Sequence, residues 1–304
     1  MTQPASKQNH ESKQNHAVGH IGPKGGTPRM RARTGLAYLA LPALLALSVP
    51  AALSASAGAA TPLTHSNHGR LIPTSGEVLP LRNADATSLN WSGYAVTGSG
   101  FTGVTQSWIV PTAGLVPPGF SSTWAGIGGY STSDLIQAGT TQDTLPVGGT
   151  QYYAWWETLP ASETPITSGC TGADPSCGVT PGDHMHVDLH ETATNVWSIT
   201  MTDANKWTWQ SPAMDYTSTH SSAEWIHEAP TFVVQTTLAN TGTTYIGPGN
   251  SYTNGSGTHP IAAGGPVSIA MGPGIINEAT PSALTNGASF NVCAWQQTCP
   301  APAA

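Results

Sequence analysis

The chain has 304 residues, with 9 Lys and Arg against 16 Asp and Glu, and a formal net charge of −7. Eight of the nine basic residues lie at or before Arg82, whereas fourteen of the sixteen acidic residues follow it. The acidic part of the chain excludes nucleic acid and anionic membrane surfaces as expected partners. At low pH this part of the chain gains little positive charge apart from its histidines. The composition therefore fits two interpretations equally: a protein adapted to an acidic medium, and an ordinary acidic secreted protein.

Residues 1–59 are predicted to be a polar N-terminal extension and a signal peptide. Three arginines at 29, 31 and 33 precede an apolar run over 36–53, and small residues at 55–59 form a cleavage site. A membrane anchor is the alternative, because the run approaches the length that spans a bilayer. Pro42, Pro50 and the Ala-rich composition favour secretion, so we expect an extracellular protein with no stable membrane association after cleavage. Met30 is a second candidate start, since it gives a signal peptide of ordinary proportions.

Residues 60–84 contain Thr, Ser and Pro without a clear period, which predicts a short pro-segment or a linker. Residues 85–304 are predicted to form one all-β domain, because short β-favouring runs alternate with Gly, Pro, Ser and Asn, and no window has a capped helical period. The predicted strands are 104–110, 123–127, 135–138, 151–158, 184–191, 196–202, 223–228, 232–238, 267–271 and 290–295.

The four cysteines are Cys170, Cys177, Cys293 and Cys299. An even number behind an export signal predicts disulfides, with three possible connectivities. The local pairs are the simplest of these, and their spacing is too wide for a Cys-x-x-Cys metal or redox motif.

The stretch Ser221–Glu228 is predicted to be a strand that carries carboxylates on one side. Alternation places Glu224, Ile226 and Glu228 on one face and Trp225 and His227 on the other. From this pattern alone a solvated strand face is favoured, because Glu is rarely buried. A second stretch, Leu135-Ile136-Gln137-Ala138-Gly139, changes that interpretation.

Together these stretches resemble motifs of the glutamic peptidases, the eqolisin family. Three further motifs agree in order along the chain, so that the resemblance covers about residues 88 to 240: Asn90-Trp91-Ser92-Gly93, Trp124-Ala125-Gly126-Ile127-Gly128 and Tyr152-Tyr153-Ala154-Trp155-Trp156-Glu157-Thr158-Leu159-Pro160. The resemblance implies a lectin-like (concanavalin A-like) antiparallel β-sandwich with one concave sheet. It also implies that Gln137 and Glu224 are catalytic, that Trp124, Trp155 and Glu157 bind substrate, and that no metal or other cofactor is used.

The two residue types suit peptide-bond hydrolysis. A carboxylate can take a proton from water and later give it to the leaving amine, while a glutamine amide donates to the carbonyl oxygen and does not titrate. We therefore expect a secreted acid endopeptidase that acts on proteins or peptides as a monomer. A family-like fold with an altered site is the alternative for this pair, and a structural carboxylate is the alternative for Glu157.

One position departs from the family pattern. Related enzymes often have Asp where this chain has Gly128, which puts the orientation of Trp124 in doubt. Asp134, three residues before Gln137, is a candidate to compensate.

Two further functions compete with this hypothesis. The run His184-Met185-His186-Val187-Asp188-Leu189-His190 places His184, His186, Asp188 and His190 on one strand face with plausible metal-ligand spacing, although a surface ladder is favoured. A non-catalytic sandwich whose tryptophans stack on sugars is the other alternative, and the presence of both Gln137 and Glu224 argues against it.

Overall fold

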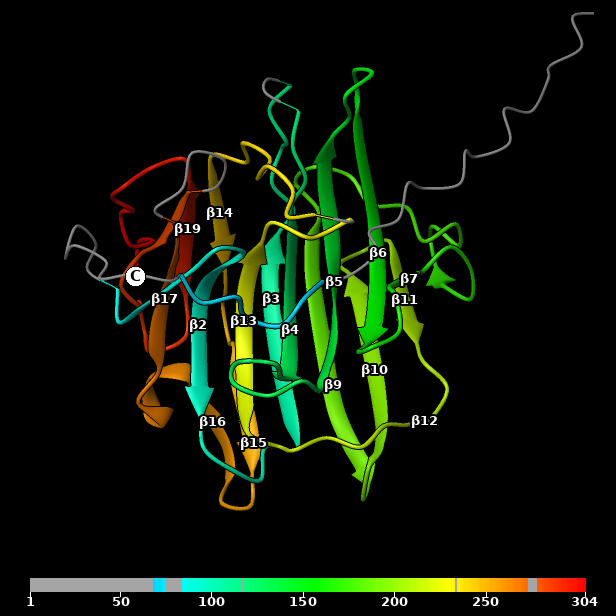
Figure 1. The fold of residues 1–304 in the computed structure, drawn as a ribbon. Helices are drawn as coiled ribbons and strands as arrows, with labels where there is room; N and C mark the ends of the chain where they lie inside the picture. Colours follow the sequence, from blue (N-terminus) through cyan, green and yellow to red (C-terminus); the bar gives the residue numbers. More distant parts are fainter. Residues whose placement is uncertain (1–67, 75–83, 116–117, 233, 273–277) are drawn as a thin grey trace, which may run out of the picture. The chain divides into compact units, whose positions relative to one another are not determined.

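The computed structural model describes residues 68–74, 84–115, 118–232, 234–272 and 278–304. The predicted signal peptide therefore lies outside the described residues. In the described part the chain forms nineteen β-strands and one short 3-10 helix, Ile261–Gly264, which confirms the all-β prediction (Figure 1). This part of the chain contains no helix that is long and apolar enough to cross a membrane.

The strands form two antiparallel layers. The first sheet has the order β17–β2–β13–β4–β5–β6–β7, and β1 adds to β17 in parallel. Its strands are β1 (Ala86–Ser88), β2 (Trp91–Thr97), β4 (Ser122–Gly128), β5 (Leu135–Thr144), β6 (Thr150–Thr158), β7 (Thr164–Pro165), β13 (Ser222–Glu228) and β17 (Val267–Met271).

The second sheet runs from β3 through β9, β10 and β11 to β8, while β14 and β15 add to the other edge of β3. Strand β18 pairs with both β17 and β19 and so joins the two sheets at one side. The remaining strands are β3 (Gly103–Ile109), β8 (Thr171–Gly172), β9 (His184–Ala193), β10 (Val196–Asp203), β11 (Trp207–Gln210), β12 (Met214–Asp215), β14 (Thr243–Ile246), β15 (Ser251–Asn254), β16 (Gly257–Pro260), β18 (Ala279–Pro281) and β19 (Phe290–Ala294).

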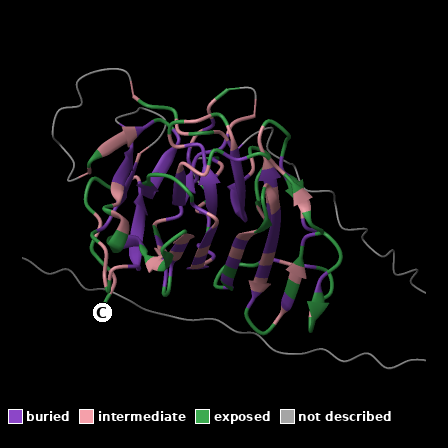
Figure 2. Ribbon diagram, turned by 90° about the horizontal axis from the view of Figure 1, so that it is seen from below, coloured by how far each residue is buried: buried purple, intermediate pink, exposed green. Residues whose placement is uncertain are grey.

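The main hydrophobic core lies between the two sheets. Alternate residues of the first sheet, such as Tyr94, Ile136 and Trp225, belong to one buried cluster with Trp108 and Leu189 of the second sheet. Figure 2 shows the buried strands gathered at the centre. Because side chains alternate along a strand, the residues between these point to the opposite, outer face of the first sheet.

The outer face of the first sheet is also buried, which the sequence did not predict. Trp91, Trp124, Trp155, Ile226 and their neighbours form a second apolar cluster there. Leu71 packs against this cluster from the segment His68–Thr74, which we call the covering segment. Figure 1 shows it in blue, crossing in front of strands of the first sheet.

Most predicted strands are confirmed to within a few residues, and one is wrong. Within the described residues, 232–238 form no strand, because the local hydrogen bonds close a turn instead. Thr236 donates to the carbonyl of Pro230 through both its amide and its hydroxyl, and the Gln235 side chain donates to Ala229 O. Both local disulfides, Cys170–Cys177 and Cys293–Cys299, are present.

Candidate active site

A row of paired residues crosses the first sheet and brings three predicted site residues together. Glu224 of β13 pairs with Gly126 of β4, Gly126 pairs with Gln137 of β5, and Gln137 pairs with Glu157 of β6. Directly paired residues project to the same face, and two strand spacings put the Glu224 and Gln137 backbones about 10 Å apart. Only a glycine lies between them in this row, so no side chain separates the two on this face of the sheet.

Gly126 is required by this arrangement. A Cβ atom on it would lie 2.9 Å from Ile136 O and 3.0 Å from both Gln137 Cβ and a methyl group of Leu135. Any larger residue would therefore push Gln137 away from its position.

Gln137 is fully buried and its amide nitrogen makes two hydrogen bonds. Nε2 donates to Glu157 Oε2 at 2.8 Å and to the main-chain carbonyl of His68 at 2.8 Å. Burial raises the pKa of Glu157 to about 8, opposed by the charge of His68 and assisted by Glu228 and Glu163. In acid Glu157 is therefore a neutral carboxyl that accepts the Gln137 proton through Oε2 and so fixes the amide orientation.

Glu224 is fully buried, and neither carboxyl oxygen has a hydrogen-bond partner among the described residues. Burial raises the pKa of Glu224 well above its ordinary value. Ser222, two residues earlier on the same face, opposes this shift although its hydroxyl lacks hydrogen-bond geometry, while the charge of Asp134 adds to it. Both oxygens of this buried carboxyl are therefore available to form hydrogen bonds with a water molecule or a substrate group.

The two predicted tryptophans lie on the same outer face and are fully buried. Trp124 Nε1 donates to Glu228 Oε2 at 2.7 Å. The Trp155 ring stacks on the His68 ring, with centroids 3.7 Å apart and planes 1° from parallel. The structure thus gathers all five predicted site residues: Trp124, Gln137, Trp155, Glu157 and Glu224.

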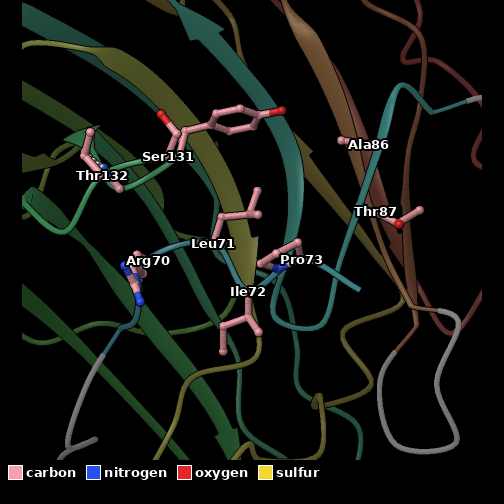
Figure 3. Close-up of a pocket in the computed structure, with 10 residues that line it drawn as sticks. Arg70, Leu71, Ile72, Pro73, Ala86, Thr87, Ser131 and Thr132 are labelled. Carbon is pink, nitrogen blue, oxygen red and sulfur yellow. Dashed lines mark hydrogen bonds between the residues drawn. The ribbon is translucent and has the colours of Figure 1, made fainter. Parts of the chain in front are cut away.

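The covering segment lies on these residues through its main chain. His68 N donates to Glu157 Oε2 at 3.2 Å, and Gly69 O accepts from Trp91 Nε1 at 2.9 Å. Further along, Leu71 N donates to Gly129 O at 3.1 Å. Figure 3 shows Arg70 to Pro73 between Ser131 and Thr132 on one side and Ala86 and Thr87 on the other, beside a pocket of about 580 Å³.

His68 and Glu163 are site residues that the sequence analysis missed, and Glu228 was recognised there only as a strand-face residue. The His68 ring places Nε2 2.6 Å from Glu163 Oε2 and Nδ1 3.3 Å from Glu228 Oε2. Although burial alone would lower it, these carboxylates raise the pKa of His68 to about 10. The available signal was charge: residues 60–84 carry basic groups, whereas the domain after them is almost free of Lys and Arg.

The structure explains the departure at Gly128. Its φ of +92° lies in the left-handed region, and a Cβ atom there would meet Asp134 O at 2.6 Å and Asp134 Oδ2 at 2.9 Å. The Asp134 carboxylate therefore occupies the space that a side chain at 128 would take. Burial would raise the pKa of Asp134, but hydrogen bonds from Thr219, Thr132 and Ser218 outweigh it and hold the group ionised.

The histidine run lies on β9 in the second sheet, with its alternate residues on the solvent-facing side. His190 Nδ1 is 2.9 Å from Asp188 Oδ1, and His186 Nδ1 is 2.9 Å from Ser107 Oγ. In the described part of the chain, no group of three or more His, Cys, Asp or Glu is arranged to hold a metal ion. The geometry is that of the predicted surface ladder.

Comparison with known proteins identifies the family. A model described as the Peptidase A4 family matches residues 89–285, more than half of the chain. The chain therefore belongs to the Peptidase A4 family, the glutamic peptidases or eqolisins, and it is an enzyme of that class. No curated protein matches the chain in sequence.

Two solved structures agree with this fold. Scytalido-glutamic peptidase with a transition state analog inhibitor is 17% identical, with a TM-score of 0.54 over 67% of this chain and 98% of that chain. The same peptidase with a peptide-based transition state analog is 16% identical, with a TM-score of 0.52 and the same coverage. The predicted antiparallel β-sandwich is thereby confirmed.

Proposed function

We propose that the protein is a secreted acid endopeptidase that hydrolyses peptide bonds with Glu224 as general base and acid and Gln137 as oxyanion donor. One observation carries this proposal: Gln137 Nε2 binds a peptide carbonyl, that of His68, at 2.8 Å in the row that also carries Glu224. The donor is thus aimed where a substrate carbonyl would lie, with a carboxyl group on the same face.

The proposed reaction follows from these two groups. The Glu224 carboxylate removes a proton from a water molecule, and the water oxygen bonds to the carbonyl carbon. Negative charge develops on the carbonyl oxygen, where the Gln137 N–H stabilises it. The carbon–nitrogen bond then breaks while the protonated Glu224 gives its proton to the leaving nitrogen, which releases an acid and an amine and restores the carboxylate.

Trp124, Trp155 and Glu157 are proposed to bind substrate. Glu157 acts on the reaction through Gln137, whose amide it orients, and is therefore a positioning residue. Its side-chain Oε2 is also proposed to accept a hydrogen bond from a main-chain N–H of the substrate, as it does from His68 N. Trp155 provides a flat wall for a substrate side chain, and Trp124 holds Glu228 in place.

We also infer that residues 60–84 act as an inhibitory pro-segment, the first of the two roles that the sequence left open. Their described part packs on the outer face through Leu71 and binds Glu157 and Gln137 through the main chain of His68, in the same row as the fully buried Glu224. We infer that the bound segment occupies the site without being hydrolysed, because it takes the place where a substrate and the attacking water would lie. Displacing the segment admits water and returns the pKa of Glu224 toward its ordinary acidic range.

The test compares two pairs of variants in the acid-treated secreted protein, using a denatured protein substrate at pH 3 to 5. Glu224→Gln is expected to abolish turnover, and Gln137→Ala to reduce it on the order of 10²–10³-fold. Matched changes at exposed or remote positions, Glu278→Gln and Gln297→Ala, are expected to retain full activity. Circular dichroism checks the fold, and near-wild-type turnover in a folded Glu224 or Gln137 variant would overturn the proposal.

A further inference from the structure

We infer that the pocket around the His68 ring is a substrate subsite that selects a flat, positively charged side chain on the residue whose carbonyl is attacked. This inference rests on the proposed roles of Gln137 and Glu224 and adds the side-chain specificity of the same site.

The main chain of His68 makes the hydrogen bonds that we expect of a bound substrate residue. Its carbonyl accepts from Gln137 and its amide donates to Glu157, so both polar groups of one residue are bound by the row that carries the proposed dyad. The side chain of that residue therefore marks where the side chain before a cleaved bond would go. In peptidase terms, the His68 ring occupies the S1 position.

The chemistry of the pocket favours a cation. Both ring nitrogens of His68 face carboxylate oxygens, at 2.6 Å from Glu163 and 3.3 Å from Glu228. A carboxylate can only accept, so an imidazole with two such neighbours binds best with both nitrogens protonated. The third wall is Trp155, whose parallel stacking admits a planar group and adds a cation–π attraction.

The carboxylates are held in place by further hydrogen bonds, which distinguishes the pocket from a surface cluster of acids. Tyr153 Oη donates to Glu163 Oε1 at 2.6 Å. Trp124 Nε1 and Asn90 Nδ2 donate to the two oxygens of Glu228. Since these groups are buried and already fixed, a planar cation such as protonated His or Arg should bind better than the compact ammonium of Lys.

The first experiment measures kcat/KM at pH 5 for one peptide with His, Arg, Lys, Phe or Leu before a single scissile bond. The enzyme is the secreted protein after acid treatment, and mass spectrometry identifies the bond cut. We expect His and Arg to exceed Phe and Leu by at least about tenfold, and Glu163→Gln to reduce the His-to-Phe ratio by about the same factor. Glu278→Gln should leave the ratio unchanged, whereas equal rates for His and Phe would overturn the inference. Turnover that survives Glu224→Gln would defeat the proposed dyad while leaving the measured preference interpretable.

The second experiment needs no activity and uses the full chain with Glu224→Gln. Position 68 is kept as His or changed to Arg, Gln or Leu, and hydrogen exchange is measured for the amides of residues 68–72 and 74. His and Arg should protect the segment, while Gln and Leu should exchange at least about tenfold faster. Equal protection in all four proteins would show that the pocket does not select a cation.

Discussion

His227 is predicted to limit the stability of this protein in acid. The side chain lies on the inner face of β13, fully buried, with Nδ1 3.0 Å from Thr123 Oγ1 and Nε2 3.1 Å from Thr241 Oγ1. Burial lowers the pKa of His227 to about 4, from an ordinary value of about 6.5. A depressed folded-state pKa means that the neutral ring contributes stability above about pH 6.5, and that this contribution is lost as the pH falls through 4. Linkage gives a loss of about 3 kcal/mol at pH 4 relative to pH 7.

The assay is urea unfolding of His227→Gln and its parent at pH 7 and pH 4, both carrying Glu224→Gln to prevent self-digestion. Glutamine can still reach the two threonine hydroxyls but does not titrate. Glu157, whose pKa is raised, affects stability in the opposite direction: its contribution to the free energy of unfolding is present in acid and is lost as the pH rises through about 8. This contribution is the same in both proteins and cancels in the comparison. The parent should lose about 3 kcal/mol more than His227→Gln on going to pH 4. His259→Gln is the control at a half-buried histidine. An equal loss in His227→Gln and its parent would refute the reasoning.

Three further outcomes are expected. Gly126→Ala should reduce kcat by about tenfold to a hundredfold, because the added Cβ displaces Gln137. Gly255→Ala is the control and should have no effect, since a Cβ there meets nothing within 4 Å; equal activities of the two variants would contradict the geometry. Gln137→Glu should be less harmful at pH 3 than at pH 6, because only a protonated carboxyl can donate to the oxyanion, and a flat ratio across pH would argue against the donor role. Thiol titration of the denatured, unreduced protein should find no free cysteine, since both pairs are bridged, and two or more thiols would disprove the pairing.

The sequence correctly predicted which side chains of β13 share a face of the sheet, but not what covers that face. Alternation along β13 assigned Glu224 and Glu228 to one face and His227 to the other, and the pairing of β13 with β4 confirms this. Strand periodicity is a local property, so it can be read without knowing which strands are neighbours. Periodicity does not say what covers a face. The pattern favoured a solvated face on β13, but every residue of the strand is buried, so both of its faces are covered.

The contacts of His68 could not be predicted for the same reason. Glu163 and Glu228 are 95 and 160 residues away from it in the sequence, and their meeting depends on the whole order of the first sheet. Strand β2 was recognised only as a motif, because Ser92 and Gly93 weaken its β signal. Gly93 is needed there, since a Cβ would lie 2.1 Å from Trp225 O of the neighbouring strand.

The covering segment belongs to the same chain as the site on which it lies, and this has a consequence for activation if the segment has the proposed pro-segment role. While the chain between Thr74 and Asp85 is intact, the segment is present at its site at an effective concentration on the order of millimolar. Even a segment whose separate affinity is only about 10 µM would then occupy the site almost completely. A single cut in that connection releases the segment into the surrounding medium, where dilution leaves the site empty. The proposed pro-segment role therefore implies an irreversible activation without any loss of intrinsic affinity, in which one cleavage suffices to free the site.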